Sequence, residues 1–274
     1  MLRGVEGTER IPGEEKDQKY DGSCRETESI KIEQRNNMAA RDKLIVALDI
    51  DNEKRCLEMI NILAPEVDIF KIGIAPFTDF GHNILEALEK AGKKVFLDLK
   101  VHDIPNTVKN AAFAAAKKKV FMMNFHCLGG PKMMTYALKG ALEGASAAGG
   151  DMPILLGVTI LTSMDQEEMN AIGMSGTVKA NVSSLARSAR KSGLNGVVAS
   201  AEETKMIKEQ LGEKFIVVTP GIRPEWAAHG DQKRVVTPSQ AIKDGSDYIV
   251  VGRPIVQADD PLEAARKILK DMEE

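Results

Sequence analysis

The chain has 274 residues, and 37 Lys and Arg against 40 Asp and Glu give a formal net charge of −3 at pH 7. This balance argues against nucleic acid or an anionic membrane as partner, and no run approaches the roughly 18 apolar residues of a transmembrane helix. Three cysteines without a CxxC or Cys/His spacing argue against a disulfide framework or a zinc site. We therefore expect a cytoplasmic protein.

Residues 1–37 differ in composition from the rest of the chain. Seven are basic and nine are acidic, so 16 of 37 are charged, and no helical or strand period runs through them. We expect a disordered extension, or an over-extended reading frame with Met38 as the natural start; a partner-binding tail is the functional alternative. Mass spectrometry of the native N-terminus tests the start. Residues 38–274 are then expected to form a single domain.

From Lys43 onward, short runs rich in Val, Ile and Phe alternate with longer amphipathic stretches, which is typical of repeated βα units. We predict strands at Leu44–Asp49, Asp68–Gly73, Val95–Lys100, Val120–His126, Ile154–Leu161, Gly196–Ser200, Phe215–Pro220 and Tyr248–Gly252. Predicted helices between and after them are Asn52–Leu63, Thr78–Ala91, Thr107–Lys118, Pro131–Ala147, Val182–Ser192, Glu202–Leu211, Ser239–Asp244 and Pro261–Met272.

Eight such units in about 230 residues indicate an α/β fold of the (β/α)8 type, a TIM barrel. A doubly wound open sheet more often has five or six strands and a Gly-rich first turn, which is missing after Asp49. Functional groups of a barrel lie at the carboxyl ends of its strands. Those ends are unusually charged in this chain.

The sharpest feature is an Asp-x-Lys-x-x-Asp motif at Asp98, Lys100 and Asp103. Because strand side chains alternate faces, Asp98 and Lys100 should point together into the barrel mouth. Buried charges need partners, so Asp103, or Lys71 on the adjacent strand, would extend the pair into a network. A fixed ammonium can stabilise a carbanion and protonate it, which points to decarboxylation or enolate chemistry. A purely structural ion-pair network is the alternative.

Simpler roles are expected for four further polar side chains. Asn106 or Thr107 should cap the helix that follows. His102 should point away from Asp98 and Lys100, and His126 either lines the pocket or forms a hydrogen bond at the rim.

The last two strands suggest a phosphate site. Pro220-Gly221-Ile222-Arg223 follows the seventh strand and Gly252-Arg253-Pro254 follows the eighth, where barrels commonly bind phosphate. Arg253 can bracket phosphate oxygens, Gln232 can donate to one, and the segment 223–237 is long enough to act as a lid. Alternatively, Gly-Arg-Pro simply ends a strand and begins a helix.

Taken together, the motifs resemble those of the bacterial orotidine 5′-phosphate decarboxylase family, over about Arg41 to Met272. The segments that carry the resemblance are 44–49 (LIVALD), 70–73 (FKIG), 98–108 (DLKVHDIPNTV), 157–163 (GVTILTS), 220–223 (PGIR), 231–234 (DQKR) and 251–255 (VGRPI).

The resemblance implies a homodimer that converts orotidine 5′-phosphate to UMP and carbon dioxide, the last step of de novo UMP synthesis, without metal or organic cofactor. It implies that Lys100 donates a proton to C6 and that Asp98 lies by the leaving carboxylate. Asp103 would enter from the second subunit, with Ile104 and Thr107 beside it. The implied substrate-binding residues are Asp49, Lys71, Ile104, Thr107, Thr162, Arg223, Gln232, Gly252 and Arg253, and the implied catalytic residues are Lys100, Asp98, Asp103 and Lys71.

Two alternatives remain at this point. A sugar-phosphate decarboxylase or synthase of the same barrel superfamily pairs a related motif with Mg²⁺, but has an acidic residue where Lys71 stands, which leaves this chain one carboxylate short for a hard cation. A non-catalytic nucleotide-binding barrel is the other alternative. The intact set of Asp98, Lys100 and Asp103 argues against it.

Overall fold

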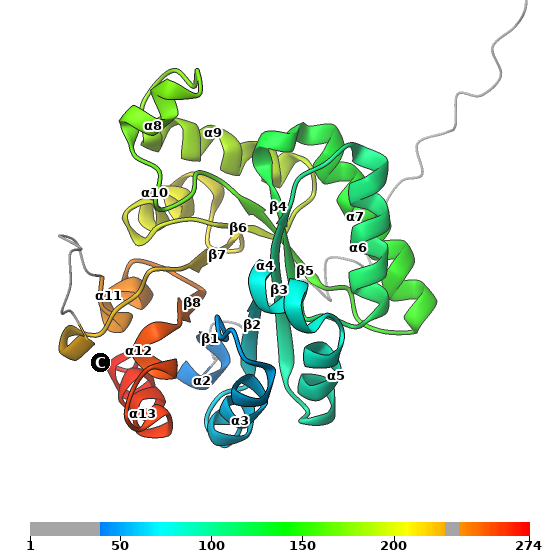
Figure 1. The fold of residues 1–274 in the computed structure, drawn as a ribbon. Coiled ribbons are helices and arrows are strands. Elements are labelled where there is room, and N and C mark those ends of the chain that lie inside the picture. Colours follow the sequence, from blue (N-terminus) through cyan, green and yellow to red (C-terminus); the bar gives the residue numbers. More distant parts are fainter. Residues whose placement is uncertain (1–38, 228–235) are drawn as a thin grey trace, which may run out of the picture. The chain divides into compact units, whose positions relative to one another are not determined.

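Eight parallel strands close into a barrel in the computed structural model, which describes residues 39–227 and 236–274. Each strand pairs with the next along the chain, and β8 pairs with β1 (Figure 1). The strands are β1 Leu44–Ala47, β2 Ile69–Gly73, β3 Lys94–Val101, β4 Met122–His126, β5 Ile154–Val158, β6 Gly196–Val198, β7 Ile216–Thr219 and β8 Tyr248–Val251. The predicted TIM barrel is therefore confirmed. The predictions for residues 1–37, for Met38 and for Gln232 lie outside the described residues, and so does most of the predicted lid, at 228–235.

Helices surround the barrel and connect its strands (Figure 1). They are α2 Ala40–Lys43, α3 Glu53–Leu63, α4 Ile74–Phe80, α5 Asn83–Lys90, α6 Pro105–Lys117, α7 Gly130–Ala148, α8 Gln166–Ala171, α9 Val178–Lys191, α10 Ala201–Leu211, α11 Pro238–Lys243, α12 Arg253–Val256 and α13 Pro261–Asp271. Short 3-10 turns lie at Cys127–Gly129 and Glu225–Ala227. No helix within the described ranges is both long and apolar enough to cross a membrane.

Two apolar layers form the core. The inner layer fills the barrel with side chains from the strands, among them Ile69, Phe96 and Met122. The outer layer packs the opposite strand faces against the helices, with Phe70 and Leu97 as examples. This division follows from the alternation of side chains along each strand.

The inner face changes from apolar to polar toward the carboxyl ends of the strands. Two residues beyond Ile69, Phe96 and Met122, the same face carries Lys71, Asp98 and Asn124, and all three polar residues are buried. Burial of polar groups is tolerated only when they have partners. The carboxyl end of the barrel is therefore the candidate position of a functional site.

Three details of the predicted helices are wrong. The single predicted helix Thr78–Ala91 is two helices, α4 and α5, because Gly81 between them takes a positive φ of 59°. The predicted helix start at Val182 lies within α9, whose N-cap is Thr177. Neither Asn106 nor Thr107 is an N-cap, because α6 begins earlier, at Pro105, and Pro suits the first helical position.

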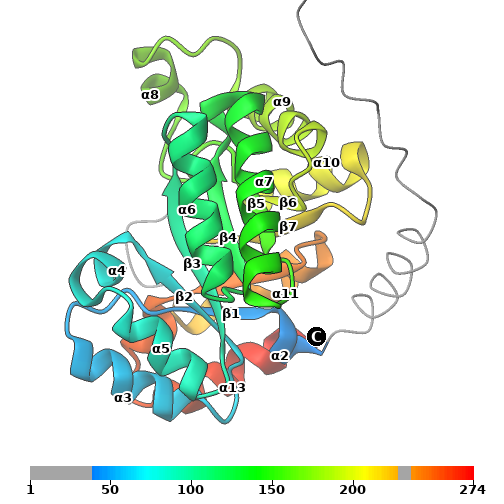
Figure 2. The ribbon, with the colours of Figure 1, turned by 90° about the vertical axis from the view of Figure 1, so that its right-hand side faces the viewer.

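Helices α6 and α7 lie side by side on the outside of the barrel (Figure 2). Their close approach requires glycine at Gly140 and Gly144, where a Cβ atom would lie 2.0 Å from the Lys109 carbonyl oxygen and 2.3 Å from that of Phe113. The pair fixes α6, and α6 directly follows the segment that carries Asp103 and Ile104.

Candidate active site

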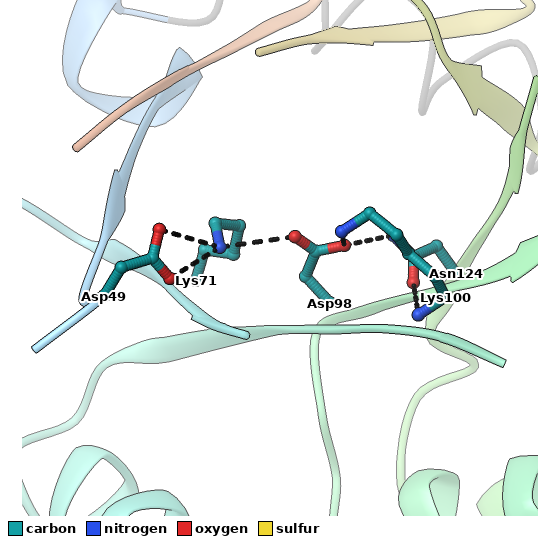
Figure 3. A network of polar contacts seen from close by, with 5 residues as sticks. All are labelled: Asp49, Lys71, Asp98, Lys100 and Asn124. Atoms are coloured by element: carbon teal, nitrogen blue, oxygen red, sulfur yellow. Dashed lines mark hydrogen bonds and ion pairs between the residues drawn. The ribbon is translucent and has the colours of Figure 1, made fainter. Parts of the chain in front are cut away.

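Four charged side chains form a row of alternating sign across the mouth of the barrel (Figure 3). Lys71 Nζ lies 3.1 Å from Asp49 Oδ1 and 3.2 Å from Asp98 Oδ2, and Lys100 Nζ lies 2.7 Å from Asp98 Oδ1. The predicted contact of Asp98 with Lys100 and the extension of the pair by Lys71 are both confirmed. Asp103 does not join the row within one chain.

Exposure differs sharply along this row. The side chains of Lys71 and Asp98 are 10% and 11% exposed, whereas that of Lys100 is 33% exposed. Two carboxylates and two ammonium groups cancel in charge, so the row satisfies the requirement that buried charges be paired. The Asp49 side chain at the other end of the row is 62% exposed, and Lys100 is the more accessible of the two ammonium groups.

Lys100 has an unusual backbone. Its φ is +49°, in the left-handed region that residues with a Cβ rarely adopt, and the register of β3 against β4 shifts between Leu97 and Val101. The regular alternation that predicted its direction is therefore interrupted by a bulge. The side chain nevertheless meets Asp98, with Lys100 Nζ 2.7 Å from Asp98 Oδ1.

Asn124 on β4 is a site residue that the sequence analysis missed. Its side-chain amide donates to Asp98 Oδ1 at 2.6 Å, and its Oδ1 accepts the backbone N–H of Lys100 at 2.8 Å. The available signal was its position on the inner face, two residues after Met122. An uncharged amide on the inner face of a buried strand has to find hydrogen-bond partners inside the barrel.

Gly73 is a second residue that was missed. A Cβ atom at this position would lie 3.0 Å from Asp49 Oδ1 and 3.2 Å from Lys71 Nζ. Both contacts are tighter than an ordinary Cβ contact, so a larger residue would press on the row. Gly73 leaves room for the ion pair between Asp49 and Lys71.

The two histidines near the motif stack on each other. The rings of His102 and His126 are 5.4 Å apart between centroids and 23° from parallel. Burial lowers the pKa of His126, and the nearby His102 and Lys100 lower it further. Its buried Nδ1 has no hydrogen-bond partner among the described residues, so the predicted rim hydrogen bond is not formed by this atom. The His102 ring thus lies against His126, and the direction of its side chain relative to Asp98 stays a prediction.

A cavity of about 290 Å³ lies beside the carboxyl ends of β7 and β8. Arg223 and Arg253 both line it, together with Trp226 and Gln257. Two guanidinium groups on one cavity suit an anion with several oxygen atoms, because each can donate two parallel hydrogen bonds. Gly252 directly precedes Arg253 as the N-cap of α12.

A larger cavity of about 1210 Å³ opens beside β5, β6 and β7. Thr162 and Ser163 line it on the β5 side, and Pro220 and Gly221 line it on the β7 side. Polar side chains and backbone groups of this kind can bind the polar edge of a ligand. The cavity lies at the same, carboxyl-terminal face as the charged row.

Comparison with known proteins identifies the family. Residues 42–268 match the model of the orotidine 5′-phosphate decarboxylase / HUMPS family. The chain belongs to this family. Orotidine 5′-phosphate decarboxylase of Saccharophagus degradans is 48% identical over 230 residues, which cover 84% of this chain and 94% of that protein. The enzyme of the same name from Legionella pneumophila is 47% identical, with 84% and 99% coverage.

Solved structures agree with this assignment. The crystal structure of orotidine 5′-phosphate decarboxylase from Lactobacillus acidophilus is 40% identical in sequence and superimposes with a TM-score of 0.75. The superposition covers 85% of this chain and 99% of that one. The predicted membership of the decarboxylase family is therefore confirmed.

Three residues that the decarboxylase resemblance assigns to the site lie apart from the charged row. Asp103 accepts the backbone N–H of Ile104 at 2.6 Å, and Ile104 is 68% exposed. Thr107 is exposed in the first turn of α6. The single chain does not bring them to its own Lys100.

The family model also covers HUMPS enzymes, so the fit of the site to a metal ion bears on its chemistry. Within the described part of the chain, no three His, Cys, Asp or Glu side chains gather closely enough to hold a metal ion. The ammonium of Lys71 lies between Asp49 and Asp98, at the place where a cation would need their oxygens. These residues do not fit a divalent cation.

Proposed function

We propose that this chain decarboxylates orotidine 5′-phosphate to UMP and carbon dioxide, the last step of de novo UMP synthesis. The observation that carries the proposal is the row Asp49–Lys71–Asp98–Lys100, in which one ammonium faces the barrel mouth. The row lies at the same face as a cavity with two arginines. A substrate with a phosphate at one end and a reacting carbon at the other fits this arrangement.

Lys100 supplies the proton in this reaction. The bond between C6 of the pyrimidine and its carboxylate breaks, the electron pair stays on C6, and carbon dioxide leaves. The Lys100 ammonium stabilises the developing carbanion and then donates one proton to C6, which gives UMP. The neutral amine regains its proton from water. Lys100 suits this task because Asp98 keeps its ammonium in place before the substrate arrives.

Asp98 has a second task in the proposed mechanism. It is a buried carboxylate beside Lys100. In the proposed complex, the leaving carboxylate of the substrate lies next to it. Two carboxylates at close distance repel each other, and this repulsion disappears when carbon dioxide leaves. Asp49 and Lys71 bind the ribose hydroxyl groups, and Thr162 binds the pyrimidine from the larger cavity.

The phosphate is bound at the other end of the site. Arg223 and Arg253 bracket its oxygens, with Gln232 and the backbone at Gly252 as further donors. Contacts to this remote, unreacting group hold the substrate in register with Lys100, so binding energy contributes to the barrier reduction.

The active form is a homodimer in this proposal. Asp103 enters the partner's site and extends the charged row, with Ile104 and Thr107 beside it. The exposure of Ile104, a large apolar side chain at the mouth of the barrel, supports this arrangement. Catalysis is assigned to the domain 38–274, and we place it in the cytoplasm.

The decisive experiment is a spectrophotometric assay with orotidine 5′-phosphate in the presence of EDTA. The purified full chain should convert the substrate to UMP, and EDTA should not change the rate. A parallel assay with keto-gulonate phosphate and Mg²⁺ tests the sugar-phosphate alternative. Turnover of only the sugar phosphate would contradict the proposal, and binding of UMP without turnover of either substrate would indicate a non-catalytic barrel.

A further inference from the structure

We infer that Asn124 is a positioning residue of this site, which fixes both the backbone of Lys100 and the carboxylate of Asp98. The inference rests on the proposed function and goes beyond it, because Asn124 carries no charge and lies outside the Asp-x-Lys-x-x-Asp motif. Asn124 is 1% exposed, so the substrate does not reach it. Its effect has to pass through the two residues that it contacts.

The first contact supports the unusual backbone of Lys100. The bulge in β3 removes the Lys100 N–H from the regular ladder, and Asn124 Oδ1 accepts it at 2.8 Å. A buried backbone N–H without a partner is unfavourable, and so is a left-handed lysine. The side chain of Asn124 therefore replaces the missing strand partner and stabilises the conformation that aims Lys100 into the mouth.

The second contact fixes Asp98. Asp98 Oδ1 accepts from Lys100 Nζ at 2.7 Å and from Asn124 Nδ2 at 2.6 Å, while Oδ2 faces Lys71 Nζ at 3.2 Å. These three donors define the plane of the carboxylate. Because the third donor is a neutral amide, the row keeps its balance of two positive and two negative charges. A lysine or an aspartate in place of Asn124 would disturb that balance.

The two contacts together require a side chain with one donor and one acceptor on a short stem. Asparagine meets this requirement, and leucine, which has the same branched skeleton but is bulkier, has neither group. Aspartate has the acceptor, but it has a donor only when it is protonated. The pair Asn124→Leu and Asn124→Asp therefore separates the loss of both contacts from the loss of the donor alone.

The test is steady-state kinetics of full-length Asn124→Leu and Asn124→Asp with orotidine 5′-phosphate. We expect kcat to fall by about 10–100-fold in Asn124→Leu, with little change in KM, because Lys100 is displaced while the phosphate end is intact. The matched control is Asn195→Leu. Asn195 Oδ1 accepts the Leu155 N–H at 2.8 Å at the opposite end of the barrel, so this variant should lose thermal stability without losing kcat.

The pH profile of Asn124→Asp gives a second readout that a merely structural residue would not change. The introduced carboxyl would face Asp98 and Lys100 on β3, and Lys71 lies on the far side of Asp98. Its neighbour on β5 is Leu156, which is uncharged. Two adjacent carboxylates share a proton at raised pKa. The ratio of kcat in Asn124→Asp to kcat in wild type should therefore rise as pH falls, and no such rise is expected for Asn124→Leu.

The outcomes are distinguishable from those of the proposed function. An active wild type with an unchanged kcat in Asn124→Leu would overturn the inference about Asn124 and leave the decarboxylase proposal intact. A fall in kcat that Asn195→Leu shows equally would also overturn it. A wild type without turnover of orotidine 5′-phosphate would contradict both.

Discussion

Asp98 is the residue on which the charged row depends. Its carboxylate accepts from two lysines and one amide, and each of these groups is itself held by a different strand. Removal of any one donor would leave a buried charge with less compensation, which costs far more than an exposed ion pair contributes. The position of the reactive ammonium is therefore fixed by several strands at once.

Substitution of Arg253 should separate substrate capture from chemistry. Arg253→Ala removes one of the two guanidinium groups of the phosphate cavity. We expect KM for orotidine 5′-phosphate to rise by about 10–100-fold, the value of a charge-assisted hydrogen bond, with a smaller effect on kcat. Steady-state kinetics measures both constants.

Binding can be followed independently in the same variant. Trp226 is the only tryptophan of the sequence and lines the same cavity, so its fluorescence should change when UMP binds. The control is Arg266→Ala, which removes an arginine paired with Glu66 on the surface. An unchanged KM in Arg253→Ala, or an equal rise in Arg266→Ala, would remove Arg253 from the phosphate site.

For single residues, the sequence predicts the charged side chains of the site better than it predicts their uncharged hydrogen-bond partners. Asp98, Lys100 and Lys71 stand out because a charged residue inside a buried strand needs an explanation. Asn124 did not stand out, since one amide among apolar residues looks like an ordinary strand residue. The left-handed backbone of Lys100 has its hydrogen-bond partner in Asn124, 24 residues along the chain, so no local pattern in the sequence reports it.

At the scale of elements, a second ion network joins helices and strands at the opposite end of the barrel. Asp68, at the start of β2, accepts from Arg41 of α2 at 2.7 Å and from Lys93 before β3 at 2.9 Å. The hydrogen bond from Arg41, with a further contribution from Lys93, lowers the pKa of Asp68 from 3.8 to about 2. This network is remote from the proposed chemistry and stabilises the fold.

The lowered pKa makes a prediction about stability. A carboxyl with a lower pKa in the folded than in the unfolded state stabilises the protein above the unfolded value and loses this effect as pH falls toward the folded value. Asp68→Asn should therefore reduce the free energy of unfolding at pH 7, by about 1–2 kcal/mol after solvent screening. The difference from wild type should fall to about half at pH 3.

Urea unfolding of both proteins between pH 7 and pH 3 measures this difference. At pH 7 and at urea concentrations too low to unfold either protein, Asp68→Asn and wild type should have the same activity. A stability difference that does not change with pH would show that Asp68 acts through packing and not through its charge.

Element boundaries were predictable only where local chemistry marks them. Asn52 was placed at the start of its helix, and its side chain does cap α3 by accepting the Arg55 N–H at 2.9 Å. Helix α8 was missed although Asp165 and Glu168 form a capping box, because the helix has only six residues. The bulge in β3 was missed because it depends on pairing with β4.

At the scale of the whole molecule, the eight apolar runs of the sequence predicted the eight strands of the barrel. All eight predicted runs contain the observed strands of the described chain or overlap them, since buried parallel strands read as short, nearly continuous apolar runs. Closure of the barrel places the carboxyl ends at one face, which is why residues far apart in the sequence meet in one site. The subunit arrangement does not follow from such a count, because it depends on a second chain.

Mixed dimers test the proposed sharing of Asp103. Lys100→Ala and Asp103→Ala should each have little activity, because each proposed site needs Lys100 from one subunit and Asp103 from the other. Random exchange of subunits in an equal mixture should restore about a quarter of the wild-type activity, since one site in each mixed dimer is then intact. Each variant incubated alone is the control. No regain after verified subunit exchange would mean that Asp103 does not act across the dimer.

The most direct test of the whole account is the rate of conversion of orotidine 5′-phosphate by Lys100→Ala, measured with EDTA present. The control variant is Lys54→Ala, which removes an exposed lysine that faces Glu58 at 3.9 Å. We expect Lys100→Ala to fold, to bind UMP as judged by Trp226 fluorescence, and to turn over at least about 10³-fold more slowly than wild type. Lys54→Ala should match wild type. Turnover by Lys100→Ala within about tenfold of wild type, a loss of only about 1.4 kcal/mol, would contradict the role of Lys100 as the proton donor.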